Sequence, residues 1–460
     1  MVMGSLPEQV DLAVIGGGVG GYVAAIRAAQ LGMNVSIVEK EKMGGHCLNY
    51  ACIPSKTLIH IADMFYAVQH AQQFGINAGS VSIDAQKMYD WRMQVSKKLE
   101  SGVEFLCRSN GVEVIKAEAT FISSNALQLT NGTSLEFKKA IIATGSHPSL
   151  LNGFAFGTNI IDYKQALMLK EIPKSMSIIG AAYVAVEIGT LYAKLGTKVS
   201  IIARSDVLSK FDPEAVALVK KRMQELGIKV YTNTTPASHT DNSIALSSGE
   251  TIPADKIVVA IGLSPTTSLL GLENTKVKLD PKGFIEVDHA MKTADDNILA
   301  IGDVVGEPLL AHKAIRQGVV AAEVASGQNS SYDNIVVPAV IFSDPEIAIA
   351  GKLEGEGITV TKFPLTAIGR GIALDRTNGF AKIAYDESGI VKGVELVSED
   401  ANAMIAEAAL AIEMGATLED IADTIHPHPT FSELMQEASE AALGRPIHFF
   451  YGKKKPEAVG

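Results

Sequence analysis

Two similar glycine-rich segments constrain the fold of this chain more than any other feature. In each one, a short apolar run meets a cluster of small residues, a helix-like segment follows, and a second apolar run closes the unit, over residues 10–38 and 175–203. Units of this kind place parallel strands side by side, with the helix packed across them. The sequence therefore predicts an α/β fold with two Rossmann-like nucleotide-binding domains.

The first segment carries the complete dinucleotide fingerprint, Gly16-x-Gly18-x-x-Gly21, and Glu39 ends the strand that follows. Glycines let the backbone approach a pyrophosphate, whose charge meets the N-terminus of the helix. The carboxylate can accept hydrogen bonds from the ribose hydroxyls. A tight glycine turn without a ligand is the plainer interpretation, but strand, helix and acidic residue all stand in the order that a dinucleotide site requires.

The second segment departs from this fingerprint. Its three glycine positions hold Gly180, Ala182 and Ala185. Alanine is tolerated at the third position, whereas the methyl group of Ala182 stands where a pyrophosphate would approach. We expect a second nucleotide site with weakened binding.

The end of the last strand in this second unit bears on which nucleotide binds. An acid at that position would bind the ribose of NAD and repel a 2′-phosphate, but the chain has Ala203 there, followed by Arg204 and Ser205. Arginine and serine suit a phosphate. The sequence predicts NADP as the preferred nucleotide, with NAD as the alternative and an exposed arginine without a ligand as the plainer interpretation.

The chain has three cysteines, and two of them, Cys47 and Cys52, are five positions apart. In a regular helix such residues have Cα atoms roughly 8–9 Å apart, beyond the limit of ~7 Å for a disulfide, so a bond between them requires a distorted turn. A bond across so small a loop gains little from chain entropy, which favours a role in exchange chemistry. Cys107 lies in an apolar setting typical of an inert core thiol.

Segment 44–56, taken with the first fingerprint, resembles the redox-active segment of the flavin-dependent pyridine-nucleotide–disulfide oxidoreductases. The resemblance extends over nearly the whole chain. It implies that FAD and a nicotinamide nucleotide bind, that Cys52 lies against the flavin as the charge-transfer thiolate, and that Cys47 exchanges with substrate. It also implies that Lys56 pairs with Glu187 near the flavin.

Three residues of this segment differ from the common family pattern, since His46, Tyr50 and Ala51 replace Thr, Val and Gly. His46 either stabilises a thiolate on the adjacent Cys47 or serves as a polar filler, and we favour the filler. Tyr50 and Ala51 would crowd the loop and shift its reduction potential.

Segment 426–433 resembles the family motif His-x-His-Pro-Thr-x-Ser-Glu. The resemblance implies that His428 is the acid/base and that Glu433 orients it, while His426 is structural. In the family this histidine comes from the partner subunit, so the resemblance implies a homodimer.

The resemblance also assigns the remaining cofactor contacts. It places Asp303 against the flavin ribityl chain and the start of a helix beneath the flavin, although Arg316 and Gln317 stand where the family has acidic residues. The implied FAD contacts are Gly16, Gly18, Gly21, Glu39, Lys56, Thr144, Gly145, Asp303, Ala311 and His312. The implied NAD(P) contacts are Gly180, Tyr183, Glu187, Arg204, Ser205 and Gly262.

By the same resemblance, four segments make up the chain. Residues 1–148 and 269–332 form the FAD-binding and central region, residues 149–268 form the NAD(P)-binding domain, and residues 333–460 form a C-terminal α+β dimerisation domain. In the last segment the pattern predicts strands at 335–342, 380–385 and 391–397 and helices at 402–414 and 431–443.

The activity that the resemblance implies is oxidation of protein-bound dihydrolipoamide through a Cys47–Cys52 disulfide and FAD to NAD(P)⁺. The implied partner is the lipoyl domain of a 2-oxoacid dehydrogenase or glycine-cleavage complex. One alternative is an NADPH-dependent disulfide reductase resembling glutathione reductase, and another is a non-catalytic docking subunit. A mercuric reductase is disfavoured, because the C-terminal segment has no cysteine pair.

Composition excludes several other classes. A formal net charge of −11 without a basic stripe argues against nucleic acid as a partner. No apolar run is long enough to span a membrane, and residues 1–8 lack the features of a signal peptide. Three cysteines in 460 residues suit a reducing cytoplasm. No cluster of ligand residues predicts a metal site.

Overall fold

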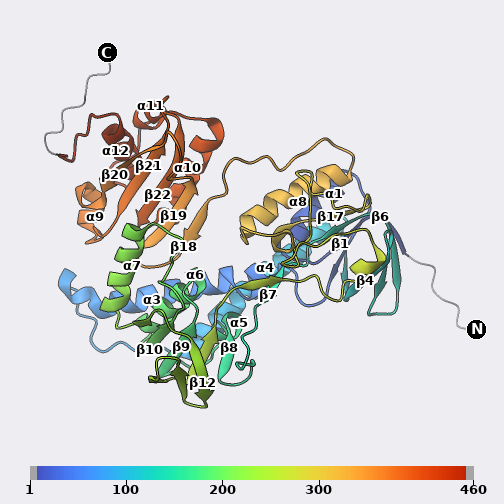
Figure 1. Ribbon diagram of the computed structural model, residues 1–460, viewed down its shortest axis with the longest axis horizontal. Helices are drawn as coiled ribbons and strands as arrows, with labels where there is room; N and C mark the ends of the chain where they lie inside the picture. The colour runs from blue at the N-terminus through green and yellow to red at the C-terminus, as the bar shows by residue number, and fades with distance from the viewer. Residues whose placement is uncertain (1–7, 452–460) are drawn as a thin grey trace, which may run out of the picture. The chain divides into compact units, whose positions relative to one another are not determined.

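The computed structural model describes residues 8–451, which divide into two compact units (Figure 1). The first unit comprises residues 8–180, 194–197 and 236–333, and the second comprises residues 181–193, 198–235 and 334–451. Each unit is therefore assembled from segments that are discontinuous in the sequence.

The first unit is organised around a seven-stranded sheet with strand order β3-β2-β1-β6-β5-β4, in which β17 also pairs with β6. The pairs β1–β2, β2–β3, β1–β6 and β6–β17 are parallel, whereas β4 and β5 form an antiparallel extension. The strands are β1 (Glu8–Ile15), β2 (Val35–Glu39), β3 (Glu113–Lys116), β4 (Ala119–Ser123), β5 (Ala126–Leu129), β6 (Ser134–Ile142) and β17 (Ile298–Ala300).

Two helices from distant parts of the sequence lie side by side on this sheet, α1 (Val19–Gln30) and α8 (Ala311–Ala325) (Figure 1). Their close approach depends on glycine, because a Cβ atom on Gly318 would lie 2.6 Å from the carbonyl oxygen of Gly20. Apolar residues of both helices join those of β1 and β2 in one buried cluster. The expected strand–turn–helix–strand unit over residues 10–38 is therefore present as β1, α1 and β2.

The other helices of the first unit include α2 and α3, which carry the cysteines, and α4, which supports them. Asp84 caps α4 by accepting a hydrogen bond from the backbone N–H of Lys87, and α4 packs against α3. These helices and 3-10 turns are α2 (Gly45–Asn49), α3 (Cys52–His70), η1 (Ala71–Phe74), α4 (Ala85–Ser109), α5 (Tyr163–Ala166), η2 (Leu272–Asn274) and η3 (Gly302–Val305).

Further strands of the first unit form smaller sheets. A parallel group has β15 between β8 and β9, an antiparallel group has β13 between β12 and β14, and β7 pairs antiparallel with β16. The strands are β7 (Ser146–Pro148), β8 (Ile160–Asp162), β9 (Ser175–Ile179), β12 (Pro236–Thr240), β13 (Ser243–Leu246), β14 (Thr251–Pro253), β15 (Lys256–Val259) and β16 (Leu263–Pro265).

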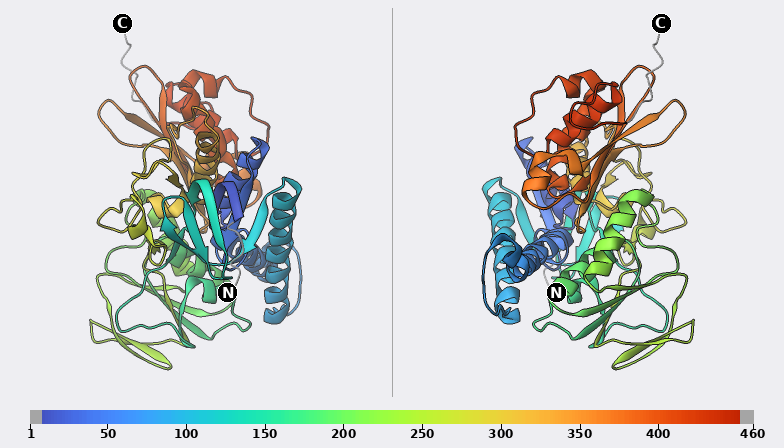
Figure 2. Two further views of the ribbon diagram at one scale, coloured as in Figure 1. Left: turned by 90° about the vertical axis from the view of Figure 1, so that its right-hand side faces the viewer. Right: turned by 90° about the vertical axis from the view of Figure 1, so that its left-hand side faces the viewer.

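The second unit contains the parallel strand pair β10–β11 and ends with a five-stranded antiparallel sheet of order β18-β19-β22-β21-β20. Its helices α10 and α12 pack on this sheet, as the red helices against the orange strands of Figure 2 show. The strands are β10 (Lys198–Ile202), β11 (Lys229–Tyr231), β18 (Ala339–Ile341), β19 (Glu346–Gly351), β20 (Thr359–Pro364), β21 (Phe380–Tyr385) and β22 (Val391–Ser398). The helices and the 3-10 turn are α6 (Tyr183–Lys194), α7 (Pro213–Glu225), η4 (Leu365–Ala367), α9 (Gly369–Ala373), α10 (Ala401–Met414), α11 (Leu418–Ala422) and α12 (Glu433–Ala442).

A buried carboxyl group lies in the middle of the C-terminal sheet. Glu395 of β22 is 0% exposed and stands opposite Lys382 of β21 and Ile349 of β19. Neither of its carboxyl oxygens has a hydrogen-bond partner among the described residues. Burial is the main reason why the pKa of Glu395 rises to about 7, and the nearby Asp212 and Glu214 raise it further.

The predicted fold class is confirmed, with local differences that have physical causes. The strand expected at 335–342 is shortened to Ala339–Ile341, because Pro338 has no N–H to donate to a sheet. Among residues 8–451, none of the helices combines the length and the apolarity that crossing a membrane requires.

Candidate active site

The cysteine segment forms a disulfide between two short helices. Cys47 lies in α2, Cys52 begins α3, and the two are bonded with their Cα atoms 4.6 Å apart. The helix breaks between them at Tyr50 and Ala51, where Ala51 has φ −128° and ψ −91°. This break is the distorted turn that the five-residue spacing requires.

The cysteine segment packs directly on the glycine fingerprint. Gly44 and Gly45 both have positive φ values, of +87° and +57°. A Cβ atom on Gly45 would lie 2.6 Å from the Cα atom of Gly18, and one on Gly44 would lie 2.5 Å from the side chain of Leu48. Only glycine allows this approach, which places the disulfide beside the predicted FAD pyrophosphate site.

Buried polar side chains of α4 hold the disulfide segment from behind. Arg92 donates a hydrogen bond of 2.6 Å to the carbonyl oxygen of Asn49, and Ser96 donates one of 3.2 Å to that of Leu48. Asn49 in turn donates from its side-chain amide to the carbonyl oxygen of Met43. These bonds satisfy carbonyl groups that the broken helix leaves without helical partners.

His46 is a half-buried imidazole. Its Nδ1 lies 3.1 Å from the carbonyl oxygen of Ser146 and its Nε2 lies 2.9 Å from the hydroxyl oxygen of Tyr163. Burial, helped by the positive charge of Lys164, lowers the pKa of His46 to about 4. A neutral ring cannot stabilise a thiolate by charge, so the structure supports the polar-filler interpretation.

Tyr50, which directly follows α2, is a second residue that differs from the family pattern. The ammonium groups of Lys42 and Lys164 lie 5.9 and 5.6 Å from the centre of its ring, within the range of cation–π attraction. Burial and the adjacent Glu41 raise the pKa of Tyr50 to about 12. The phenol is therefore protonated at neutral pH, and its ring lies at the C-terminal end of α2.

The first fingerprint has the shape that a dinucleotide requires. Gly16 has φ +104°, and a Cβ atom there would lie 2.4 Å from the carbonyl oxygen of Ala143. A Cβ atom on Gly21 would lie 1.9 Å from the carbonyl oxygen of Gly16, whereas one on Gly18 would meet no described atom within 4 Å. The middle glycine therefore faces open space at the N-terminus of α1, where a pyrophosphate fits.

Glu39, at the end of β2, lies beside this turn. One carboxylate oxygen accepts a hydrogen bond of 2.7 Å from the backbone N–H of Gly17, and the other accepts one of 2.6 Å from that of Glu41. Each carboxylate oxygen has a second lone pair. The residue can therefore hold the turn and still accept a ribose hydroxyl.

Asp303 lies in η3 and is largely buried, which raises its pKa. Its carboxylate accepts a hydrogen bond of 2.7 Å from the hydroxyl of Ser146. The buried Lys313 donates to the carbonyl oxygen of Gly306 at 2.5 Å, and its charge partly offsets the effect of burial on Asp303. A polar, partly compensated site at this turn suits the hydroxyl groups of a ribityl chain.

Gln317, which stands where the family has an acidic residue, has a defined structural role. The side-chain oxygen of this buried residue accepts a hydrogen bond of 2.8 Å from the backbone N–H of Gly302, so it fixes the turn that leads into Asp303. Ala311 and His312 form the first turn of α8, and the cap residue Leu310 makes no side-chain hydrogen bond to it. The exposed N–H groups of such a turn favour negative charge.

Thr144 and Gly145, near the end of the first predicted FAD segment, are hydrogen-bonded to Thr266, near the end of the predicted NAD(P) segment. The hydroxyl of Thr144 donates to the carbonyl oxygen of Thr266 at 2.7 Å, and the backbone N–H of Thr266 donates to the carbonyl oxygen of Gly145 at 2.9 Å. Gly145 has φ +69°. These hydrogen bonds therefore hold the segment after β6 against the segment after β16.

The predicted NAD(P) residues are distributed over both units. In the first, Gly180 has φ +123° and a Cβ atom there would lie 2.1 Å from the carbonyl oxygen of Ala260, while Gly262 has φ +131°. In the second, Tyr183 begins α6. Ala182 is exposed, and the hindrance of a pyrophosphate by its methyl group stays a prediction.

Arg204 and Ser205 follow β10 and are both exposed. The next residue, Asp206, forms an ion pair of 2.9 Å with Lys220, so its charge is engaged with α7. Glu187 is buried in α6, and its carboxylate accepts a hydrogen bond of 3.2 Å from the backbone N–H of Phe342. Lys56 lies in the first unit, in the first turns of α3.

The predicted acid/base pair is assembled in the second unit. Nδ1 of His428 lies 2.7 Å from one carboxylate oxygen of Glu433, and the other oxygen accepts a hydrogen bond of 2.9 Å from the backbone N–H of Thr430. The side chain of His428 is 76% exposed. Glu433 therefore fixes the tautomer with the proton on Nδ1, leaving Nε2 to accept a proton from a substrate.

His426 has a separate partner. Its Nε2 lies 2.9 Å from the carboxylate of Glu407 in α10, and this contact raises the pKa of His426. His426 therefore ties its loop to α10, which fits the structural role expected of it.

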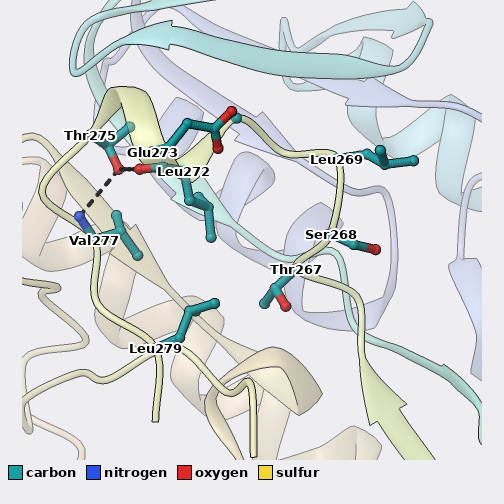
Figure 3. A pocket seen from close by; sticks show the side chains of 9 residues that line it. Thr267, Ser268, Leu269, Leu272, Glu273, Thr275, Val277 and Leu279 are labelled. Carbon is teal, nitrogen blue, oxygen red and sulfur yellow. Dashed lines mark hydrogen bonds between the residues drawn. The ribbon is translucent and has the colours of Figure 1, made fainter. Parts of the chain in front are cut away.

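A shallow pocket of about 500 Å³ lies elsewhere in the first unit (Figure 3). Glu273 is the only titratable residue in its wall, and no predicted site residue lines it. The lining residues are Thr267, Ser268, Leu269, Gly271, Leu272, Glu273, Thr275, Val277 and Leu279. Within residues 8–451, no group of His, Cys, Asp and Glu side chains is arranged to hold a metal ion.

These features define a flavoprotein disulfide oxidoreductase, and the comparisons with known proteins agree. Residues 10–318 match the pyridine nucleotide-disulphide oxidoreductase family, and residues 337–439 match the dimerisation domain of that family. The chain belongs to the pyridine nucleotide-disulphide oxidoreductase family. Membership implies FAD and a nicotinamide nucleotide, NAD, as cofactors.

Curated relatives narrow the class. The chain is 46% identical to dihydrolipoyl dehydrogenase of Geobacillus stearothermophilus and 41% identical to that of Bacillus subtilis, in each case over 97% of this chain and 99% of the relative. Among solved structures, LpdA from Mycobacterium tuberculosis matches with a TM-score of 0.88 and 25% identity over 94% of this chain and 100% of that one. The flavoprotein disulfide reductase RclA from Escherichia coli shares the fold, with a TM-score of 0.85 and 24% identity over 94% and 99% of the two chains.

Sequence reasoning missed several residues that support the site. Tyr163, Ser146 and Arg92 contact the disulfide segment from positions between 43 and 117 residues away along the chain. No local pattern marks such residues, because a hydrogen-bond partner brought in by the fold leaves no spacing signal. Lys313 lies within the sequence motif at the start of α8. Its positive charge in that motif is a signal from which an interaction with Asp303 could have been predicted.

Proposed function

We propose that this protein oxidises protein-bound dihydrolipoamide to lipoamide, with a nicotinamide nucleotide as the final electron acceptor. The observation that carries the proposal is the Cys47–Cys52 disulfide, held at a helix break directly on the dinucleotide fingerprint. The curated relatives named dihydrolipoyl dehydrogenase, matched over nearly the full length of both chains, support this substrate.

The chemistry follows from the roles of three side chains. Nε2 of His428 takes a proton from one substrate thiol, and the resulting thiolate attacks Cys47, so that Cys52 leaves as a thiolate. The second substrate thiol then displaces Cys47, which leaves lipoamide with a disulfide and the protein with two reduced sulfurs. FAD, when bound, supplies the route by which these two electrons reach NAD(P)⁺ as hydride, while the remaining proton goes to water.

Cys52→Ser is the direct test of this proposal. We expect the variant to lose dihydrolipoamide oxidation completely, because it cannot form the disulfide, yet to keep NAD(P)H-dependent reduction of ferricyanide, which needs only the flavin. Steady-state assays of both reactions provide the measurement. Cys107→Ser is the matched control, since Cys107 is buried and its burial raises the pKa of its thiol to about 11. Unchanged dihydrolipoamide turnover in Cys52→Ser would refute the proposal.

We further propose that NADP is preferred to NAD. The support is the exposed Arg204 next to Ala203 at the end of β10, where no carboxylate is present to bind a ribose diol. Arg204→Glu should lower kcat/KM for NADP by at least about tenfold and leave that for NAD within about threefold. Lys221→Glu, at an exposed position of α7, controls for the change in charge. A wild-type enzyme that favours NAD would show that the strand end does not select the nucleotide.

The proposed assembly is a homodimer that receives the lipoyl domain of a 2-oxoacid dehydrogenase or glycine-cleavage complex. The dimerisation-domain match and the exposed apolar side chains of Leu410, Met414 and Ile425 support self-association. We assign residues 1–148 and 269–332 to FAD, residues 149–268 to NAD(P) and residues 333–460 to the dimer interface, and we propose a cytoplasmic location.

A further inference from the structure

The residue next to Cys47 belongs to a chain of hydrogen-bonded residues that reaches the predicted flavin side of the site, in which Ser146 contributes two separate groups, its backbone carbonyl and its hydroxyl. A carbonyl oxygen only accepts, so Nδ1 of His46 carries the proton and donates to Ser146, and Nε2 therefore accepts from the hydroxyl of Tyr163. The hydroxyl of Ser146, a different group from the carbonyl that His46 contacts, donates to the carboxylate of Asp303.

The members of this chain come from separate elements of the first unit. His46 lies in α2, Ser146 in β7, Tyr163 in α5 and Asp303 in η3. His46 is partly exposed as a residue, but both of its ring nitrogens are occupied, and Tyr163 is buried. A buried donor or acceptor that loses its partner destabilises its surroundings, so the chain resists displacement of any one member.

A second observation links α2 to α5 independently of these hydrogen bonds. Tyr50 follows His46 by one helical turn, and the Tyr50 ring meets the ammonium group of Lys164, the residue after Tyr163. The ring of His46 lies edge-on to that of Tyr50, with 6.0 Å between the centres. Two of the three residues at which the cysteine segment departs from the family pattern, His46 and Tyr50, thus contact two consecutive residues of α5.

A capping box holds α5 itself in place. The carboxylate of Asp162 accepts from the backbone N–H of Gln165, and the side chain of Gln165 accepts from the backbone N–H of Asp162. The capping box therefore fixes the start of α5, which carries the two residues that contact the cysteine segment, Tyr163 and Lys164.

We propose that His46 and Tyr163 are a pair of positioning residues that hold Cys47 in the orientation needed for thiol–disulfide exchange. The pair acts as a neutral anchor between α2 and α5 and links the disulfide segment to Asp303. This inference rests on the proposed function, and it adds residues that the general chemistry of the family does not require, since the family has threonine in place of His46.

The test uses the FAD-loaded enzyme and Tyr163→Phe, which removes only the hydroxyl. We expect kcat for dihydrolipoamide oxidation to fall about tenfold with little change in KM, because a misplaced sulfur reacts slowly although the substrate still binds. The rate at which dithiothreitol produces the thiolate–flavin charge-transfer absorbance should fall by the same factor. Reduction of ferricyanide by NAD(P)H should be unchanged in Tyr163→Phe. The matched control is Tyr385→Phe in β21, whose thermal midpoint should equal that of the wild type.

A double-mutant cycle tests the pairing itself. His46→Thr restores the family residue but cannot accept from Tyr163 in the same geometry, so it should lower the two rates. Because the two residues act through one hydrogen bond, His46→Thr/Tyr163→Phe should be no slower than His46→Thr alone. Multiplied losses would show two independent effects and overturn the proposal, as would an unchanged rate in Tyr163→Phe.

The outcomes also separate this inference from the proposed function. Equal loss of ferricyanide reduction and bound FAD in Tyr163→Phe would show a purely structural role and overturn the anchor. If the wild-type enzyme reacted with dithiothreitol but not with dihydrolipoamide, the proposed substrate would be wrong, while the dithiothreitol rates would still decide whether His46 and Tyr163 position Cys47.

Discussion

Replacing His428 with Gln is expected to lower kcat for dihydrolipoamide oxidation by about 10²–10⁴, the usual contribution of general acid–base catalysis. The imidazole is exposed and its Nδ1 is held 2.7 Å from the carboxylate of Glu433, which leaves Nε2 as the only group of the pair able to take the thiol proton. Gln has no basic nitrogen, so the substrate must supply its own thiolate. The measurement is kcat across a pH range, in which the variant should recover partly at high pH as the substrate thiol ionises.

The controls separate proton transfer from general damage. NAD(P)H-dependent ferricyanide reduction should be unaffected by His428→Gln, since that reaction bypasses the disulfide. His239→Gln, an exposed histidine of β12, should leave both activities intact. Glu433→Gln should cause a smaller loss than His428→Gln, because it weakens the orientation of the imidazole but keeps the base. Full turnover by His428→Gln at neutral pH would exclude this residue as the base.

The same variant tests the proposed homodimer. If the base reaches the disulfide from a partner subunit, neither His428→Gln nor Cys52→Ser alone has a working site. A mixture that has exchanged subunits would contain mixed dimers with one complete site, and would regain about a quarter of wild-type activity by random pairing. No recovery from exchanged subunits would place both residues in the site of a single chain.

Replacing Glu395 with Gln should stabilise the protein by ~3 kcal/mol at pH 8, since each unit of pKa shift corresponds to 1.36 kcal/mol. The carboxyl group is buried in β22 without a hydrogen-bond partner among the described residues, and its pKa is raised from 4.5 to about 7. The groups around it include Asp212 and Glu214, whose charges raise this pKa, and Lys382, whose charge lowers it. Gln has nearly the same volume and carries no charge.

The raised pKa of Glu395 determines how the free energy of unfolding changes with pH. Between pH 4.5 and about 7 the folded protein keeps the proton that the unfolded chain has released, so the free energy of unfolding falls as pH rises through this window. Above pH 7 the loss is complete, and below pH 4.5 it is absent. Glu395→Gln should therefore match the wild type at low pH, exceed it increasingly up to about pH 7, and keep that difference to pH 8.

Urea unfolding at a series of pH values from 5 to 8 provides the measurement. Glu354→Gln is the matched control, because Glu354 is an exposed residue of the same unit. The control should shift the transition little at any pH. A constant difference between Glu395→Gln and the wild type across the series would show that the carboxyl group does not change its ionisation in this range.

Local sequence patterns predicted those features that depend on neighbours in the chain. The spacing of Cys47 and Cys52 required a break in the helix, and the structure has that break at Tyr50 and Ala51. The order of strand, glycines and acid likewise predicted a strand that ends at Glu39, and β2 ends there. In each case the required geometry is encoded within a few dozen residues.

Features that depend on contacts between distant segments could not be predicted. The role of His46 follows from Ser146 and Tyr163, which lie 100 and 117 positions further along the chain. Gln317 had no interpretation until the fold brought its side chain to the backbone N–H of Gly302. Such partners are fixed by tertiary packing, which hydrophobic periodicity and turn signals do not specify.

The contact between Gly20 and Gly318 also has a consequence for the order in which the protein can mature on the ribosome. Helix α1 is synthesised early, but the helix that covers its apolar side, α8, ends only at Ala325. Until then the apolar side chains shared by the two helices stay exposed in the nascent chain, a state that favours aggregation and chaperone binding. The buried cluster shared by α1, α8, β1 and β2 therefore cannot be completed before more than two thirds of the polypeptide has been translated.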